Sequence, residues 1–278
     1  MDSCLYVVAT PIGNLGDLSA RAVEVLRSVD LIAAEDTRHS QRLLQHYAID
    51  TPVMAYHDHS DERPVTRIGD CIAAGGSVAL VSDAGTPLIS DPGYRLVRSI
   101  QDAGFAVRPI PGACAAIAAL SASGLATDRF LFEGFLPARA GPREKRLDKL
   151  VMESATLIFY EAPHRVLESL QAMAAAFGDT REAVLAREVT KTFETIRRGS
   201  LAELATFVAG DSHQQKGEIV LLVAGVREQP TEITAGVSAL LRRLAEELPA
   251  KTAASVVADH TGLRKKQLYD FLVAVKDT

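Results

Sequence analysis

Residues 82–93 concentrate side chains that can bind a ligand, because they read Ser-Asp-Ala-Gly-Thr-Pro-Leu-Ile-Ser-Asp-Pro-Gly. An apolar segment of strand length, residues 77–81, precedes them, and a helical pattern follows. The stretch should therefore leave the carboxyl end of a buried strand, where ligands bind in an open α/β sheet. Gly85 permits close approach of the backbone, while Asp83 and Thr86 offer polar atoms. A plain strand-to-helix turn uses similar residues but needs fewer of them, so a ligand site is favoured.

Charged residues also follow two other predicted strands. Glu35-Asp36-Thr37-Arg38-His39 comes after residues 31–34, and Glu188-Val189-Thr190-Lys191 comes after residues 182–187. Charges at strand ends can face the same crevice as the loop at 82–93. The aspartate or threonine of the first group could equally cap the helix that follows it. Both interpretations remain open at this point.

A local basic excess lies between residues 139 and 149. It comprises Arg139, Arg143, Lys145, Arg146 and Lys149, against Glu144 and Asp148. A charge run of this kind is commonly a solvated helix face. Because the run follows the start of a second predicted domain, a phosphate-binding surface at the interdomain cleft is an equal alternative.

Two other kinds of site have little support. His57 and His59 are two residues apart, but no third metal ligand is evident nearby, so no metal site is expected. The first loop contains Gly13 and Gly16, which is neither the spacing of the dinucleotide fingerprint nor a phosphate loop.

The elements expected to position these groups alternate between strand and helix, which is typical of an α/β fold. Strands are predicted at residues 5–10, 31–34, 53–56, 77–81, 107–110, 130–136, 155–160, 182–187 and 217–225. Helices are predicted at residues 20–27, 41–47, 67–74, 94–103, 115–123, 143–152, 166–177, 237–248, 251–259 and 265–275, with a further helix capped by Ser200 after a turn at 197–201.

The length and composition of the chain limit its number of domains, its partners and its cellular compartment. The chain has 278 residues, enough for two domains, with 47% hydrophobic and 23% charged residues. A net charge of −5 means that a polyanionic partner would have to meet a local basic patch. The cysteines Cys4, Cys71 and Cys114 show neither metal spacing nor a disulfide framework, and no signal peptide precedes the first strand. A cytoplasmic protein without a membrane span is expected.

Six motifs together resemble one family. In order along the chain they are residues 8–19, 34–38, 82–93, 109–113, 132–137 and 160–165. They are similar to the bacterial small-subunit ribosomal RNA (cytidine-2'-O)-methyltransferase I family, within the tetrapyrrole methylase superfamily. The resemblance covers about residues 4 to 226.

The resemblance implies two α/β domains of the tetrapyrrole methylase type with a ligand cleft between them. It divides the chain into an N-terminal α/β domain (1–122), a C-terminal α/β domain (123–228) and a helical tail (229–278), with Pro230 and Thr231 in a linker. It implies S-adenosylmethionine as methyl donor and a homodimer. The implied partner is small-subunit (16S) ribosomal RNA or the assembled small subunit.

The family's donor-binding positions carry over residue by residue. They are Pro11 in the first loop, Asp83, Ala84, Gly85 and Thr86 in the second, Pro111, Gly112 and Ala113 in the third, and Tyr160, Ala224 and Gly225 in the C-terminal domain.

Methyl transfer to a ribose hydroxyl needs an in-line approach to the donor methyl and a group that removes the hydroxyl proton. Candidate catalytic residues are Glu35, Glu188 and Lys191, with Asp36 and His164 also near strand ends. Residues expected to bind RNA are Arg38, Arg139, Arg143, Lys145, Arg146, His164 and Arg165.

Two alternatives remain. A tetrapyrrole methylase would use the same fold on a macrocycle carrying carboxylates, and a non-catalytic RNA-binding protein would bind donor without turnover. The stretches Glu-Asp-Thr-Arg and Tyr-Glu-Ala-Pro-His-Arg favour an RNA methyltransferase over a tetrapyrrole methylase. Residues 251–269 have the pattern of a helix-turn-helix, which is either a substrate-docking module or a helical cap.

Overall fold

The first sheet of the protein is fully parallel and has the first strand near its middle. In the computed structural model, which describes residues 2–57, 63–226, 233–261 and 263–276, its order is β3-β2-β4-β1-β5. The strands are β1 (Cys4–Val8), β2 (Leu31–Ala34), β3 (Val53–Ala55), β4 (Val78–Val81) and β5 (Ala106–Ile110). Leu5 of β1 pairs with Val78 of β4 on one side and Val107 of β5 on the other.

Helices cover both faces of this sheet, which explains why its central strands are apolar throughout. On one face α1 (Ala20–Ser28) and α2 (Thr37–His46) bury Leu26 and Leu44. On the other face α3 (Arg63–Ala73) and α4 (Tyr94–Asp102) bury Ile72 and Leu96. Because β1, β2 and β4 are buried on both faces, a ligand can reach these strands only at their ends and loops.

The second sheet is mixed, with the order β6-β7-β10-β8-β9. Its strands are β6 (Phe130–Phe135), β7 (Thr156–Glu161), β8 (Glu182–Arg187), β9 (Thr195–Ser200) and β10 (Ile219–Val223). Only β6 and β7 pair in parallel, because β10 runs antiparallel to both β7 and β8. The start of β10 therefore lies beside the end of β7, where Ile219 pairs with Glu161.

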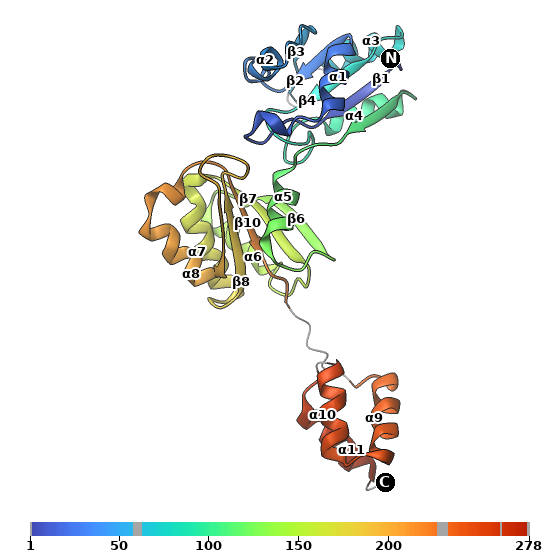
Figure 1. Ribbon diagram of the computed structural model, residues 1–278, viewed down its shortest axis with the longest axis vertical. Coiled ribbons are helices and arrows are strands. Elements are labelled where there is room, and N and C mark those ends of the chain that lie inside the picture. The colour runs from blue at the N-terminus through green and yellow to red at the C-terminus, as the bar shows by residue number, and fades with distance from the viewer. Residues whose placement is uncertain (1, 58–62, 227–232, 262, 277–278) are drawn as a thin grey trace. The chain divides into compact units, whose positions relative to one another are not determined.

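The two faces of the second sheet are covered unequally (Figure 1). The helices α6 (Ala140–Asp148), α7 (Val166–Phe177) and α8 (Leu201–Gly210) pack on one face. The helix α5 (Ala115–Ser123) packs on the other through Ala116, Ala119 and Leu120. This helix belongs to the second sheet by packing, although the predicted boundary at residue 122 groups it with the first.

The chain divides into two compact units, Met1–Gly225 and Val226–Thr278. Both sheets lie in the first unit. The second contains α9 (Ala235–Glu247), α10 (Ala250–Thr261) and α11 (Lys265–Lys276), which share a small core of Leu241, Val257 and Leu268. The predicted linker residues Pro230 and Thr231, and Gly262 of the predicted turn, lie outside the described residues. No described helix combines the length and apolar character needed to cross a membrane.

Most predicted elements are confirmed, and four have the predicted bounds: β2, β8, α5 and α7. The structure also contains the short 3₁₀ helices η1 (Leu15–Asp17), η2 (Pro163–Arg165) and η3 (Ser212–Gln215). The helix predicted at 41–47 begins earlier, at Thr37, because the Asp36 carboxylate accepts from the amides of Arg38 at 2.8 Å and His39 at 3.4 Å. This contact establishes Asp36 as a helix cap.

Three other predictions also differ clearly from the structure. The turn predicted at 197–201 is the second half of β9, an edge strand whose Ser200 nevertheless caps α8 as expected. The helix predicted at 143–152 is α6, which ends at Asp148. The helix α3 starts at Arg63 rather than at residue 67. The apolar residues Leu150 and Val151 extended the predicted helix beyond Asp148, whereas the polar sequence of β9 gave no apolar alternation.

Candidate active site

Three loops meet at the carboxyl edge of the first sheet, because β4, β1 and β5 are neighbours with the same direction. Thr10 and Gly85 join the first two loops: the Thr10 amide donates to the Gly85 carbonyl at 2.8 Å, and the Gly85 amide donates back at 3.1 Å. The Thr86 hydroxyl donates to the carbonyl of Ala113 at 3.0 Å, which fixes the third loop. The loops therefore form one continuous surface.

Two glycines make this close packing possible. Gly85 has a φ of +86°, and a Cβ there would lie 3.3 Å from Cγ2 of Ile12. A Cβ on Gly112 would lie 2.9 Å from the Cβ of Ala9. A side chain at either position would push the loops apart, as the sequence pattern predicts for Gly85.

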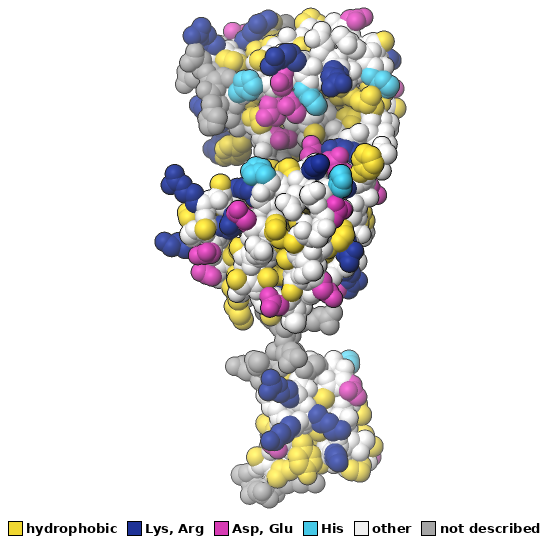
Figure 2. All heavy atoms as spheres, turned by 90° about the vertical axis from the view of Figure 1, so that its left-hand side faces the viewer, with side chains coloured by type: hydrophobic (Ala, Val, Ile, Leu, Met, Phe, Trp, Pro, Cys, Tyr) yellow, Lys and Arg dark blue, Asp and Glu magenta, His cyan; other side chains and the backbone are white. Residues whose placement is uncertain are grey.

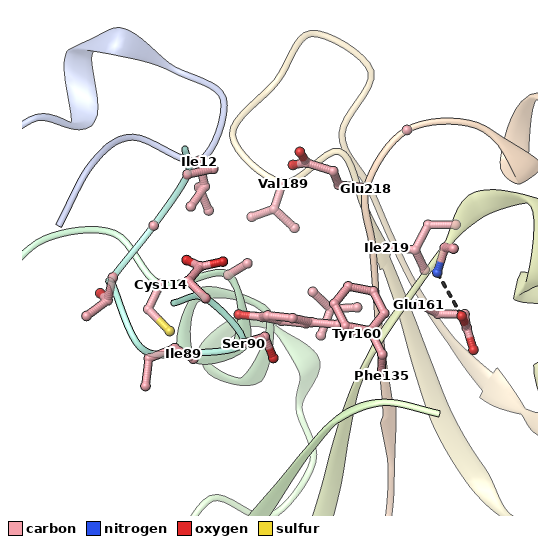
Figure 3. Close-up of a pocket in the computed structure, with 18 of the residues that line it drawn as sticks. Ile12, Ile89, Ser90, Cys114, Phe135, Tyr160, Glu161, Val189, Glu218 and Ile219 are labelled. Carbon is pink, nitrogen blue, oxygen red and sulfur yellow. Dashed lines mark hydrogen bonds between the residues drawn. The ribbon is translucent and has the colours of Figure 1, made fainter. Parts of the chain in front are cut away.

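A cavity of about 370 Å³ opens between these loops and the edge of the second sheet. Figure 3 shows Ile12, Ile89 and Cys114 on the side of the first sheet and Phe135, Tyr160 and Ile219 on the side of the second. Most of the wall is apolar, and the backbone of Gly85 forms part of it. A ligand of intermediate size with a flat apolar part fits such a wall.

Tyr160 is the main aromatic element of the cavity. Its ring lies edge-on to Phe132, with centroids 4.9 Å apart, and to Phe135 at 5.8 Å. Its hydroxyl accepts from the Ala116 amide at 3.2 Å, in the first turn of α5. Burial raises the pKa of Tyr160, so the side chain stays neutral at physiological pH.

Carboxylates crowd the same edge of the first sheet. Asp91 lines the cavity, and burial raises its pKa. Burial also raises the pKa of Glu35, and the nearby charges of Asp91 and Asp83 raise it further. Asp83 is held by the Asp36 amide, which donates to its Oδ1 at 3.0 Å. A bound cation would relieve the repulsion among these groups.

Lys191 connects the loop between β8 and β9 to the first loop. Its Nζ donates to Glu188 Oε1 at 2.8 Å and to Glu218 Oε2 at 3.1 Å. Its aliphatic chain covers Gly13, where a Cβ would lie 2.4 Å from Lys191 Cγ. The backbone is strained here, since Glu188 and Thr190 have φ values of +52° and +70°.

Hydrogen bonding fixes the charges of this pair. Burial alone would lower the pKa of Lys191, but its bonds to Glu188 and Glu218 outweigh burial and raise it. Burial would raise the pKa of Glu188, but the hydrogen bonds from Lys191 and the Glu218 amide, together with the charges of Lys191 and Arg187, outweigh burial and lower that pKa. Lys191 is therefore a cation at neutral pH, and Glu188 a carboxylate.

A second cavity of about 330 Å³ adjoins the first. It is more polar, with Pro11, His39, Ser40, Arg42, Asp83 and Lys191 in its wall. Ile12, Ala84 and Glu218 line both cavities. Of the predicted donor-binding residues, Ala84, Gly85, Thr86 and Tyr160 line the first cavity, while Pro11, Asp83 and Ala84 line the second.

The structure places Ala224 and Gly225 away from both cavities, contrary to the expectation that they enclose the donor. They follow the far end of β10, where the Ala224 carbonyl accepts from Arg181 and a Cβ on Gly225 would lie 1.9 Å from the Ser154 carbonyl oxygen. Because β10 is antiparallel to β7, Ile219 at its start reaches the cavity instead.

Several predicted RNA-binding residues have structural partners. Arg165 donates to Glu161 Oε1 at 2.6 Å and is 16% exposed, so it holds the turn after β7. The Arg143 side chain is only 7% exposed and pairs with Glu168 at 3.3 Å. Arg146 donates to the buried carboxylate of Glu133 at 2.6 Å. These contacts differ from the phosphate contacts expected for all three.

The remaining predicted RNA-binding residues are available on the surface. Arg139, Lys145 and His164 are exposed, and the Arg38 side chain is 91% exposed beside Asp36. His59 of the histidine pair lies outside the described residues. Within the described part of the chain, no group of three or more His, Cys, Asp or Glu side chains is placed to hold a metal ion.

Sequence reasoning missed Glu218 and Ser40. Glu218 precedes a long apolar strand and carries no motif, and Ser40 lies within a helix. A glycine before Glu218 was the one available signal: Gly217 has a φ of +82°, and a Cβ there would overlap Glu188.

Comparison with known proteins defines the class first. The family described as Tetrapyrrole (Corrin/Porphyrin) Methylases matches residues 4–205. The fold is similar to uroporphyrin-III-C-methyltransferase from Thermus thermophilus, with a TM-score of 0.57 and 19% identity over 79% of this chain and 93% of that one. It is also similar to cobalt precorrin-4 methyltransferase, with a TM-score of 0.58 and 16% identity over 80% and 95%. The protein is a methyltransferase of the tetrapyrrole methylase class.

Closer relatives define the family within this class. The chain is 58% identical to ribosomal RNA small subunit methyltransferase I of Pseudomonas aeruginosa over 95% of both chains. It is 50% identical to the Haemophilus influenzae protein of that name over 97% of this chain and 96% of that one. Residues 231–276 match a family described as the RsmI C-terminal HTH domain. The chain belongs to the ribosomal RNA small subunit methyltransferase I family, which confirms the resemblance.

Proposed function

We propose that this protein transfers the methyl group of S-adenosylmethionine to the 2'-oxygen of a cytidine in small-subunit (16S) ribosomal RNA. The observation that carries the proposal is the 58% identity over 95% of the chain to a small-subunit rRNA methyltransferase. The paired cavities at the loop edge support it, because one can take a methyl donor and the other an acceptor.

The first cavity fits S-adenosylmethionine. Tyr160 and the apolar side chains around it offer a surface for a nucleoside base, and the Gly85 backbone allows close approach. Asp91 and its neighbour Glu35 place negative charge beside the cavity, which suits a sulfonium cation. When bound, this donor supplies an electrophilic methyl group.

The chain's own residues supply positioning and electrostatics. The three loops are fixed by the Thr10–Gly85 and Thr86–Ala113 contacts, so a donor would meet a preorganised wall. Lys191 lines the second cavity as a cation and would stabilise negative charge that develops on an acceptor hydroxyl. Glu188 holds Lys191 in place.

Further parts of the proposal concern partners. Arg38, Arg139, Lys145 and His164 are exposed and suited to contact RNA phosphates. A homodimer in the cytoplasm is proposed from the family resemblance. Ile117 on α5 and Phe130 on β6, which are 49% and 46% exposed, are large apolar side chains that a second copy would cover.

Labelled donor tests the activity. Purified protein is incubated with methyl-labelled S-adenosylmethionine and, separately, with 16S RNA, assembled small subunits and a porphyrin precursor. Label in RNA, located on a cytidine 2'-oxygen by mass spectrometry, is the expected outcome. RNA from cells lacking the protein should lack that modification. Label in the porphyrin precursor alone would refute the proposal, as would donor binding without transfer to any acceptor.

A further inference from the structure

We propose that the second cavity is the acceptor-nucleoside subsite and that Glu218 takes the proton from the attacking ribose hydroxyl. The inference rests on the proposed function, in which the acceptor is a 2'-hydroxyl. It deepens that function by naming the place where donor and acceptor meet.

The position of Glu218 follows from the two cavities. A methyl group can pass from a donor in the first cavity to an acceptor in the second only where the two cavities adjoin. The residues that line both cavities at this junction are Ile12, Ala84 and Glu218. Of these, Glu218 is the only ionisable one among the described residues, and Figure 3 shows its carboxylate beside Val189 at the edge of the first cavity.

The surroundings of Glu218 suit a proton acceptor. Its backbone is fixed in both directions, because its amide donates to Glu188 Oε1 at 2.9 Å and its carbonyl accepts from the Glu188 amide at 2.9 Å. Oε2 accepts from Lys191 at 3.1 Å. Among the described residues nothing donates to Oε1, and the side chain is 68% exposed, so this oxygen is open to a substrate.

The other carboxylates are less well placed. Glu35 and Glu188 line neither cavity, Asp91 lines only the first and Asp83 only the second. Asp83 also uses one oxygen to accept from Asp36. Glu218 therefore replaces Glu35 and Glu188 as the residue that we assign to proton removal.

The second cavity has the polarity that a nucleoside needs. Ser40 in its wall is only 4% exposed, and its hydroxyl has no hydrogen-bond partner among the described residues. A buried hydroxyl without a partner is unfavourable, and rotation about one bond can bring it to a ligand. His39 and Arg42 in the same wall can donate to base or phosphate oxygens.

The transfer balances with these groups. The 2'-O–H bond breaks, and its proton goes to the Glu218 carboxylate. The oxygen electron pair forms the new bond to the methyl carbon, while the carbon–sulfur bond breaks and its electron pair returns to sulfur. Lys191 keeps its proton throughout and stabilises the oxygen as charge develops on it.

Glu218→Gln is the main test, because the exchange preserves shape in an exposed side chain and should not affect folding. We expect kcat on the RNA substrate to fall about 100-fold or more, in the range of general base catalysis. The rise of kcat with pH at the acidic end of the wild-type profile should disappear. Glu24→Gln, an exposed carboxylate on α1 outside both cavities, is the matched control and should behave as wild type.

Glu188→Gln separates chemistry from positioning, because Glu188 also binds Lys191. If Glu218 acts only by holding Lys191, the two variants will lose activity equally and both will keep the wild-type pH profile. That result would overturn the assignment, and so would a Glu218→Gln variant with wild-type kcat. If the wild-type protein itself transfers no methyl to RNA, the proposed function fails and this inference fails with it.

A binding measurement tests the subsite without turnover. Ser40→Ala should weaken binding of an RNA fragment that carries the target cytidine by about tenfold, the cost of one hydrogen bond to a buried group. The donor Kd should remain unchanged. Ser123→Ala is the control, since Ser123 is equally buried but donates to the Leu120 carbonyl in α5. Equal RNA affinity in the Ser40 and Ser123 variants would refute the subsite.

Discussion

Gly85 shows how a single residue can determine whether a cavity exists. It forms an isolated β-bridge with Thr10, has a left-handed backbone and lies against Ile12. A Cβ at this position meets the loop that forms the opposite part of the wall. Gly85 lies in the loop after β4, as the sequence predicted, and it is also packed closely against Ile12.

Replacing Gly85 with valine should abolish donor binding while the fold survives. The added side chain displaces Ile12 and narrows the first cavity, so we expect the donor Kd to rise more than tenfold. Titration calorimetry with S-adenosylmethionine measures it. Gly104→Val is the control, because Gly104 has a similar φ of +83° but open space around its Cβ. If both variants bind donor like wild type, the cavity is not the donor site.

Asp91 and Glu35 predict a pH dependence of donor binding. Burial raises both pKa values in the free protein, and a sulfonium cation nearby would lower them again. Binding should therefore release protons at pH values just above the ordinary carboxyl range. Affinity should rise as pH increases through the raised pKa values and then level off. Calorimetry in two buffers with different ionisation enthalpies measures the released protons. A binding enthalpy that is the same in both buffers would contradict this account.

At the scale of elements, α6 has two different kinds of basic residue. Arg143 is buried and pairs with Glu168, and Arg146 is exposed but pairs with Glu133, whereas Arg139 and Lys145 are exposed without a carboxylate partner among the described residues. The basic residues of this run therefore differ in whether a carboxylate partner lies nearby, which the sequence alone does not show. Arg139 and Lys145 are the members of this set that are both exposed and free to meet phosphates.

Alanine at both Arg139 and Lys145 should weaken RNA binding and reduce its dependence on salt. Loss of two phosphate contacts lowers the slope of log K against log salt by about 1 to 2. Filter binding over a series of salt concentrations measures the slope, and donor affinity should not change. Arg21→Ala is the control, because Arg21 is an exposed residue of α1. An unchanged slope in the double variant would identify the segment as a solvated face.

Local signals predicted the elements well where periodicity was strong. The strands β2 and β8 and the helices α5 and α7 are rich in apolar residues, and their bounds were predicted correctly. The strand β9 was missed because Thr195–Ser200 is a polar edge strand, stabilised by pairing with β8 rather than by burial. Edge strands carry little of the sequence signal that burial imposes.

Only the part of the site that belongs to the first sheet could be predicted from the sequence. Loops that follow parallel strands must meet at one edge, so Asp83, Gly85 and Thr86 could be located from the sequence. Glu218 reaches the same place only because β10 runs antiparallel in another sheet, and Ala224 and Gly225 lie far away for the same reason. Pairing between distant strands decides such positions, and no local pattern encodes it.

At the scale of the whole molecule, the chain divides into two compact units. Both cavities lie within Met1–Gly225, and the C-terminal unit has a core of its own. On the face shown in Figure 2, Lys and Arg side chains gather on the C-terminal unit beside a group of hydrophobic ones. We propose that this unit docks the RNA substrate.

A chain that ends at Gly225 should bind donor with wild-type affinity, because it keeps every residue of the first cavity. Its KM for the RNA substrate should rise at least tenfold, with a smaller change in kcat. Steady-state methylation of the physiological substrate measures both values. The full chain with alanine at Arg264, Lys265 and Lys266, at the start of α11, tests the same surface without truncation. Wild-type KM in the shortened chain would show that the tail is dispensable for docking.

The place of β1 in its sheet has a consequence for synthesis. β1 is made first, yet its two neighbours are β4 and β5, and the latter ends at Ile110. At translation rates of about 5–20 residues per second, this apolar strand waits on the order of 5–20 s for its second partner. During that interval the nascent chain leaves one edge of an apolar strand open, although that strand will lie inside its sheet. The strand β1 is thus without a partner until β4 is made and open at one edge until β5 follows, which is longer than consecutive hairpins would require.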